Sequence, residues 1–233
     1  GGGTAGLVCA HRVKAAGIPV VLLEASKRAG GRMFTDRTTF GPEQVCELGG
    51  EFVDTGHATM HALVKELGLT LEDVRAASDG LEPAFEFGGK LHSEADVIEA
   101  LRPAAAALDE DMKDLDLGDK PYESGPRAKA LDALSIDEWL KTRGLTGLGA
   151  DLLRVSFTTE LGLEPDVLSV IPMLQMFSLE ADKLELYGES DERFHVRGGN
   201  DLVVHALAGR LADAIETGVA LESLREGSDG GVL

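Results

Sequence analysis

The chain has 233 residues, of which 43% are hydrophobic, and its 41 acidic against 22 basic residues give a formal net charge of −19. A phosphate backbone or an anionic lipid surface repels such an acidic chain, which argues against nucleic-acid and membrane-surface binding. No apolar stretch of the sequence reaches the length that spans a bilayer, and two cysteines cannot form a disulfide framework or a four-ligand zinc site.

The two ends of the sequence predict a piece of a longer protein, or the ordered part of one. A glycine turn such as residues 1–6 normally follows a buried strand, and residues 229–233 look like a hairpin turn that enters a new strand. A targeting peptide would lie upstream of such a piece, so the localisation stays unknown, with the cytoplasm as the default.

The first segment predicts an alternation of helix and strand. Small and apolar residues recur at helical spacing from Thr4 to Ala16. The continuous apolar run over residues 18–23 is typical of a strand buried on both faces, and it ends in Glu24. A second helix is expected from about His57 to Leu67.

The middle of the chain, residues 61–190, is expected to be mostly helical. Its predicted parts are a hairpin over 85–92, an alanine-rich helix over 93–115, a break over 121–126, a capping box at Ser135 and helices near 150–160 and 166–177. The helical block interrupts the βα pattern, which indicates that one domain is inserted in another.

The βα pattern returns in the last segment. A strand is expected over 193–196, a helix from Leu202 to Ile215 with Asn200 or Asp201 as its cap, and a strand over 219–221. The predicted fold class is therefore α/β: a Rossmann-like βα domain formed by residues 1–60 and 191–233, interrupted by a mostly helical domain over residues 61–190.

The first six residues, Gly-Gly-Gly-Thr-Ala-Gly, fit the pattern G-x-G-x-x-G at the start of a helix. In such a loop Gly1 makes the tight turn, Gly3 lets the main chain approach a pyrophosphate, and Gly6 lets the helix pack against its strand. Glu24 ends the second strand, where an acidic side chain accepts hydrogen bonds from a ribose hydroxyl and disfavours a 2′-phosphate. The simpler alternative is a glycine-rich loop, but the order of helix, strand and Glu24 favours dinucleotide binding.

The sequence from Glu24 to Thr35, EASKRAGGRMFT, resembles the E-A-x-x-R-x-G-G-R-x-x-T signature of the flavin-dependent amine oxidase family. The match extends to ELGGEF at residues 47–52 and to VRGGNDL at residues 196–202. Within the family the chain looks most similar to bacterial flavin monoamine and L-amino-acid oxidases. The resemblance implies FAD as the cofactor, held by the βα domain, and a helical domain that covers the substrate.

The resemblance also implies roles for individual residues. It places Arg32 near the FAD pyrophosphate, which a guanidinium can hold through two hydrogen bonds. It places Gly49 to Glu51 beside the isoalloxazine ring and the main chain of Leu221 near the adenine. The alternative readings are a surface ion pair for Arg32 and a solvated carboxylate for Glu51. The predicted cofactor-binding residues are Gly1, Gly3, Thr4, Ala5, Gly6, Glu24, Ala25, Arg32, Gly49, Gly50, Glu51 and Leu221.

The function that the resemblance implies is oxidation of an amine or amino acid to the imine, with O2 reduced to H2O2. The family's lysine near the flavin, its aromatic cage and its second FAD-binding segment lie in a downstream half, so no catalytic residue is nominated. Two alternatives stay open: a non-catalytic truncated or processed fragment, or a related flavoprotein of the carotene desaturase or protoporphyrinogen oxidase type. The expected partners are a small-molecule amine and O2, with a homo-oligomer or a complementary chain as a further possibility.

A metal site is not predicted. His57 and His61 lie four residues apart on one helical face, but the sequence offers no H-E-x-x-H pattern and no evident third ligand.

Overall fold

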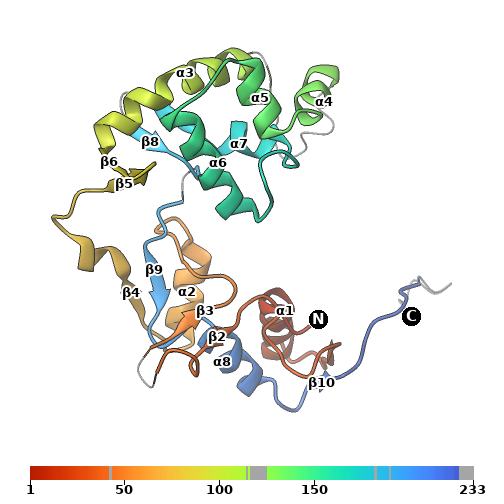
Figure 1. The fold of residues 1–233 in the computed structure, drawn as a ribbon. Coiled ribbons are helices and arrows are strands. Elements are labelled where there is room, and N and C mark those ends of the chain that lie inside the picture. Colours follow the sequence, from red (N-terminus) through yellow and green to blue (C-terminus); the bar gives the residue numbers. More distant parts are fainter. Residues whose placement is uncertain (42–43, 114, 116–124, 181–182, 189, 226–233) are drawn as a thin grey trace. The chain divides into compact units, whose positions relative to one another are not determined.

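The structure is a computed structural model that describes residues 1–41, 44–113, 115, 125–180, 183–188 and 190–225 (Figure 1). It forms two compact units: Gly1–Asp79 together with Asp191–Leu233, and Gly80–Ser190. The second unit is therefore inserted in the sequence of the first. The expected turn over residues 229–233 and most of the expected break over 121–126 lie outside the described residues.

In its described residues, the first unit combines short strands with three α-helices and one 3-10 helix. Its elements are α1 (Thr4–Ala15), β1 (Leu22–Glu24), β2 (Thr35–Asp36), β3 (Cys46–Glu47), α2 (Ala58–Glu66), β4 (Leu71–Asp73), the 3-10 helix η1 (Val74–Ser78), β9 (Phe194–Val196), α8 (Leu202–Arg210) and β10 (Ile215–Thr217). Strand β1 pairs in parallel with β10, with Leu22 opposite Ile215, whereas β2–β3 and β4–β9 are antiparallel. Both ends of the chain thus contribute to one unit.

The core of the first unit joins residues from both ends of the sequence. Its fully buried members come mainly from α1, α2 and α8, and they include Leu7, Val64, Val203 and Leu207. Burial of these apolar side chains holds α8 against α1, although the two helices are separated by most of the chain. This packing fixes the glycine loop before α1 to the rest of the unit.

The strand predicted over residues 18–23 differs from the observed one. β1 covers only Leu22–Glu24, and the side chains of Ile18 and Val21 are 56% and 63% exposed. Burial on both faces requires neighbouring strands and covering helices, and within the described residues β1 pairs with β10 alone. The expectation of a strand buried on both faces was therefore wrong.

Two boundaries also differ from the prediction. α8 ends at Arg210, and Ile215, expected as part of that helix, starts β10 opposite Leu22 of β1. The strand expected over 219–221 is therefore found at residues 215–217 instead. The compact first unit also extends to Asp79 instead of ending at residue 60, because α2 joins its core and β4 pairs with β9.

The second unit is mainly helical. Its elements are β5 (Ala84–Phe87), β6 (Lys90–Ser93), α3 (Glu94–Met112), α4 (Pro126–Asp132), α5 (Ile136–Thr142), α6 (Leu148–Leu161), α7 (Val170–Met176), β7 (Ser178–Glu180) and β8 (Lys183–Glu185). Capping boxes start α3 at Ser93 and α5 at Ser135, where each hydroxyl accepts a hydrogen bond from a main-chain N–H in the first turn. The expected hairpin is present as β5–β6.

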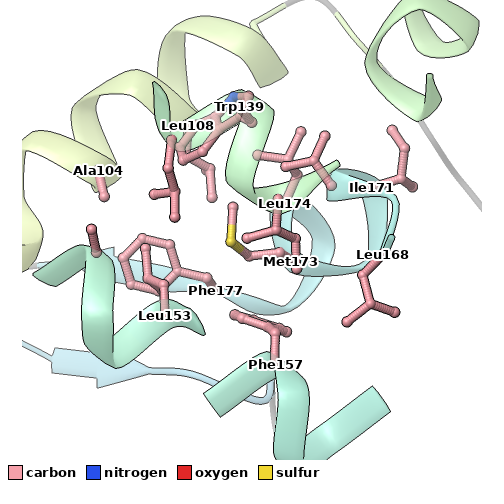
Figure 2. Packing of buried hydrophobic residues seen from close by; sticks show 14 of the residues in the cluster. Ala104, Leu108, Trp139, Leu153, Phe157, Leu168, Ile171, Met173, Leu174 and Phe177 are labelled. Atoms are coloured by element: carbon pink, nitrogen blue, oxygen red, sulfur yellow. The ribbon is translucent and has the colours of Figure 1, made fainter. Parts of the chain in front are cut away.

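The core of the second unit is separate from that of the first. Figure 2 shows Trp139, Phe157 and Phe177 among aliphatic side chains from α3, α6 and α7. The Trp139 indole N–H donates to the buried Asp111 carboxylate at 2.7 Å, and Arg143 donates to the other oxygen of the same group. These bonds satisfy the polar atoms of Trp139 and Asp111 inside an otherwise apolar core.

Candidate cofactor site

A hollow of about 920 Å³ lies on the first unit, where three segments of the chain meet. These segments are the glycine loop with the start of α1, the turn before β2, and the stretch after β3. The lining residues are Gly1, Gly3, Thr4, Ala5, Gly6, Gly30, Gly31, Arg32, Met33, Leu48, Gly49 and Gly50. Eight of these lining residues are among the predicted cofactor-binding residues, so the structure brings together parts that are up to 49 positions apart.

Close packing of the main chain requires glycine at two positions in the hollow. A β-carbon at Gly6 would lie 1.9 Å from the carbonyl oxygen of Gly1, and one at Gly49 would lie 1.7 Å from the carbonyl oxygen of Arg32. Gly3 is different, because the nearest atom to its β-carbon position is 3.9 Å away. Gly6 therefore serves the tight loop more than the contact with β1, and Gly3 leaves space open toward the hollow.

The N-terminus of α1 faces this space. Its N-cap residue Gly3 has no side chain to cap the helix, and the first turn contains no acidic residue. The first main-chain hydrogen bond of the helix runs from Leu7 N–H to Gly3 O at 2.9 Å, which leaves the earlier N–H groups without helical acceptors. Such a helix end is positively polarised and suits a phosphate group.

Arg32 adds a positive charge at the same hollow. Its side chain is exposed, and no residue in the described ranges forms a hydrogen bond or ion pair with it. The nearby Arg28 is used differently: it donates to the carbonyl oxygen of Gly31 at 2.8 Å and lies over the Phe34 ring at 4.8 Å from its centroid. Arg32 is thus the arginine of this turn that is available to an anionic ligand.

Glu24 lies beside the loop and not among the lining residues. One carboxylate oxygen accepts from Gly2 N–H at 2.6 Å, and the other accepts from Ser26 N–H at 2.8 Å. Hydrogen bonding with Ser26, and then with Gly2, lowers the pKa of Glu24 to about 2, so the group is ionised at neutral pH. An ionised carboxylate has about four acceptor positions, and the two bonds leave capacity for a hydroxyl donor.

Besides Glu24, three predicted residues are not among those that line the hollow. Ala25 is exposed beside Glu24, and the exposed Glu51 follows Gly50, which does line it. Leu221 is 70% exposed beyond the end of β10, although Val219 N–H donates to Glu24 O at 3.0 Å and keeps that segment alongside β1. Four lining residues were not among the predicted ones: Gly30, Gly31, Met33 and Leu48. All four lie in the stretches that resemble the family signature, which was the signal that could have found them.

Both histidines of the pair are hydrogen-bonded to the main chain of Asp54. His61 Nε2 is bonded to Asp54 O at 2.9 Å, and His57 Nδ1 accepts from Asp54 N–H at 3.0 Å. Within the part of the chain that the structure describes, no three His, Cys, Asp or Glu side chains are grouped so that they could hold a metal ion. In the same part, no helix has both the length and the apolar character that crossing a membrane requires.

The family model "Flavin containing amine oxidoreductase" matches residues 4–233. Curated relatives include putrescine oxidase of Kocuria rosea, 27% identical over 99% of this chain and 49% of the relative. They also include the flavin-dependent L-tryptophan oxidase RebO of Lentzea aerocolonigenes, 28% identical over 94% of this chain and 49% of the relative. The chain thus spans about half the length of these relatives.

The fold is similar to that of solved oxidases. Cyclohexylamine oxidase from Brevibacterium oxydans IH-35A matches with a TM-score of 0.76 and 22% identity, over 100% of this chain and 52% of that one. Wild-type putrescine oxidase bound to putrescine matches with a TM-score of 0.70 and 21% identity, over 97% of this chain and 51% of that one. At this identity the likeness shows the mixed helix-and-strand, Rossmann-like fold alone.

Proposed function

This chain belongs to the flavin-containing amine oxidoreductase family, and we propose that it is the FAD-holding part of an oxidase that converts an amine or amino acid to an imine. The observation that carries the proposal is the hollow of the first unit, lined by all three segments that carry the family signature near the start of the chain. The cofactor of the family is a flavin.

The residues present fit a dinucleotide. The N-terminus of α1 and the side chain of Arg32 would hold the pyrophosphate, because both are positive and neither is used by another described group. Glu24 would accept from a ribose hydroxyl, with Ala25 beside it. Gly49, Gly50 and Glu51 would border the isoalloxazine ring, and the main chain near Leu221 would meet the adenine.

Bound FAD would supply the redox chemistry, which removes a hydride from the α-carbon of a neutral amine and reduces O2 to H2O2. The imine then reacts with water to give a carbonyl compound and ammonia or an amine. The contribution of this chain is to bind and orient the cofactor. We further propose that the helical second unit contributes to binding of the substrate.

The test begins with a visible spectrum of the purified chain after incubation with FAD and removal of the excess. A bound flavin spectrum is expected for this chain, which we expect to be inactive alone. Peroxide release with a panel of diamines, cyclic amines and amino acids is then measured on the full reading frame. A flavin-loaded chain that reduces an artificial electron acceptor without peroxide would favour a desaturase or dehydrogenase type instead. A colourless chain would contradict the proposal that these residues hold FAD by themselves.

A further inference from the structure

Asn200 is not among the residues that line the hollow, yet it is hydrogen-bonded to the main chain of Gly50 and Glu51. These belong to residues 49–52, the stretch after β3, which we call the wall of the hollow. The residue is 2% exposed and precedes α8, far in sequence from the residues that line the site. We propose that Asn200 is a positioning residue for the cofactor site, whose carboxamide fixes the main chain at Gly50 and Glu51. This inference rests on the proposed function, because it assigns the wall to a flavin.

The carboxamide of Asn200 is fully engaged with two segments. Its Nδ2 donates to the carbonyl oxygens of Gly50 at 3.0 Å and Glu51 at 2.5 Å. Its Oδ1 accepts from Val196 N–H of β9 at 2.8 Å, and its main-chain N–H donates to the Glu47 carboxylate at 2.8 Å. One side chain therefore ties the stretch after β3 to a strand of the unit.

The wall has few other restraints. Residues 49–52 belong to no strand. Within the described residues, the main-chain hydrogen bonds of this stretch are those from Asn200 and a long one from Gly50 N–H to Arg32 O at 3.3 Å. A hydrogen bond to a main-chain carbonyl is directional, so two of them to adjacent carbonyls fix both the position and the tilt of the segment. Asn200 therefore supplies two of the three bonds that shape this wall.

The neighbouring Asp201 has a different task. Its buried carboxylate accepts from Arg37 at 2.5 Å and from Thr35 N–H at 3.2 Å, so it holds β2. Within the described part of the chain, Asp201 makes no hydrogen bond to residues 49–52. Removal of the Asn200 donors is consequently specific to the wall, and Asn200→Asp is a close match in shape that cannot donate to the carbonyls of Gly50 and Glu51.

The experiment measures hydrogen exchange of the apo chain and its FAD dissociation constant in Asn200→Asp and Asn200→Ala. We expect exchange at the Gly50 amide, which donates to Arg32 O, to speed up by roughly 10-fold or more. The dissociation constant should rise by a similar factor, with a changed visible band shape of the bound flavin. Val203→Ala is the matched control, because Val203 is fully buried on α8 and belongs to the core. It should lower the melting temperature without changing either quantity.

Each outcome decides the inference. Unchanged exchange at the wall in both Asn200 variants would overturn it, as would faster exchange with an unchanged FAD dissociation constant. An equal loss of FAD affinity in Val203→Ala would assign the effect to general stability and overturn it as well. If the unsubstituted chain binds no FAD, the proposed function fails by itself, whereas the exchange data still report whether Asn200 holds the wall.

Discussion

The Glu24 carboxylate accepts a hydrogen bond from the Gly2 main-chain N–H at 2.6 Å and thereby joins the end of β1 to the loop that precedes α1. The acidic residue that the sequence assigned to a ribose thus also shapes the phosphate loop. The same group would act on two parts of the cofactor, directly through a ribose hydroxyl and indirectly through the position of Gly3.

Substitution of Glu24 by Ala should weaken FAD binding by roughly 10- to 100-fold, because both the ribose acceptor and the support of Gly2 are lost. Glu24→Gln keeps one acceptor oxygen and turns an amide N–H toward one main-chain donor, so its loss should be smaller. Isothermal titration of the apo chain with FAD measures both. Unchanged affinity in Glu24→Ala would contradict the assignment of Glu24 to the site.

Arg32→Ala should weaken FAD binding but leave the melting temperature of the apo chain unchanged, since the described residues offer its side chain no partner. Arg28→Ala is the comparison, because it removes bonds to main-chain carbonyls and the contact with Phe34 and should therefore lower the apo melting temperature. The FAD affinity of the unsubstituted chain should also fall as salt is raised, more steeply than that of Arg32→Ala. Equal salt dependence in the two proteins would argue against a contact between Arg32 and a phosphate.

Predictions from sequence succeeded where local chemistry decides the structure. The hairpin over β5 and β6 turns at Gly88 and Gly89, both with positive φ, and the capping box at Ser135 starts α5. The predictions failed where contacts with residues distant in the sequence decide the structure. Val21 suits a buried strand by composition but stays 63% exposed, and Ile215 leaves its expected helix to pair with Leu22.

The candidate site shows the same division. Signature residues such as Gly6, Arg32 and Gly49 were predicted, and they line one hollow. Asn200 was expected only as a possible helix cap, yet it bonds to Gly50, 150 positions away in the sequence. Its partners could not be deduced from spacing, because the approach of β9 to the stretch after β3 depends on the folded core.

Gly6→Ala should abolish FAD binding or weaken it strongly, because the added β-carbon would lie 1.9 Å from Gly1 O and must displace the loop. Gly209→Ala on α8 is the control: nothing lies within 4 Å of its β-carbon position. That change should stabilise the chain by about 0.5–1 kcal/mol through helix propensity and leave FAD affinity unchanged. Flavin fluorescence and thermal unfolding together measure both effects, and full FAD affinity in Gly6→Ala would contradict the tight-loop geometry.

The stability of the first unit should fall as pH decreases from about 5 toward 2. Hydrogen bonds from Arg12, and then from His11, lower the pKa of Glu66 to about 2, below its value of about 4.3 in an unfolded chain. A depressed folded pKa gives stability that is present above the unfolded pKa and is lost as the pH falls through the folded one. Glu66→Gln should therefore have a lower melting temperature at pH 7 and a smaller decrease on acidification. Glu216 forms no ion pair with a described residue, so Glu216→Gln should follow the unsubstituted chain. Parallel curves for Glu66→Gln and the unsubstituted chain would show that the Arg12–Glu66 contact does not contribute.

Asp111→Ala should destabilise the second unit by roughly 3 kcal/mol, because it leaves the buried Trp139 N–H without an acceptor and separates Arg143 from its buried carboxylate partner. Asp111→Asn keeps an acceptor oxygen for Trp139 but loses the charge and the second oxygen, which accepts from Arg143, so its cost should be smaller than that of Asp111→Ala. Trp139 is the single tryptophan of the chain and is fully buried in this unit, so its fluorescence during urea unfolding reports on the second unit alone.

Equal midpoints for the two variants would mean that the indole N–H bond contributes little and that the ion pair with Arg143 carries the effect. A midpoint for Asp111→Ala equal to that of the unsubstituted chain would contradict the role of Asp111 as the polar anchor of this core.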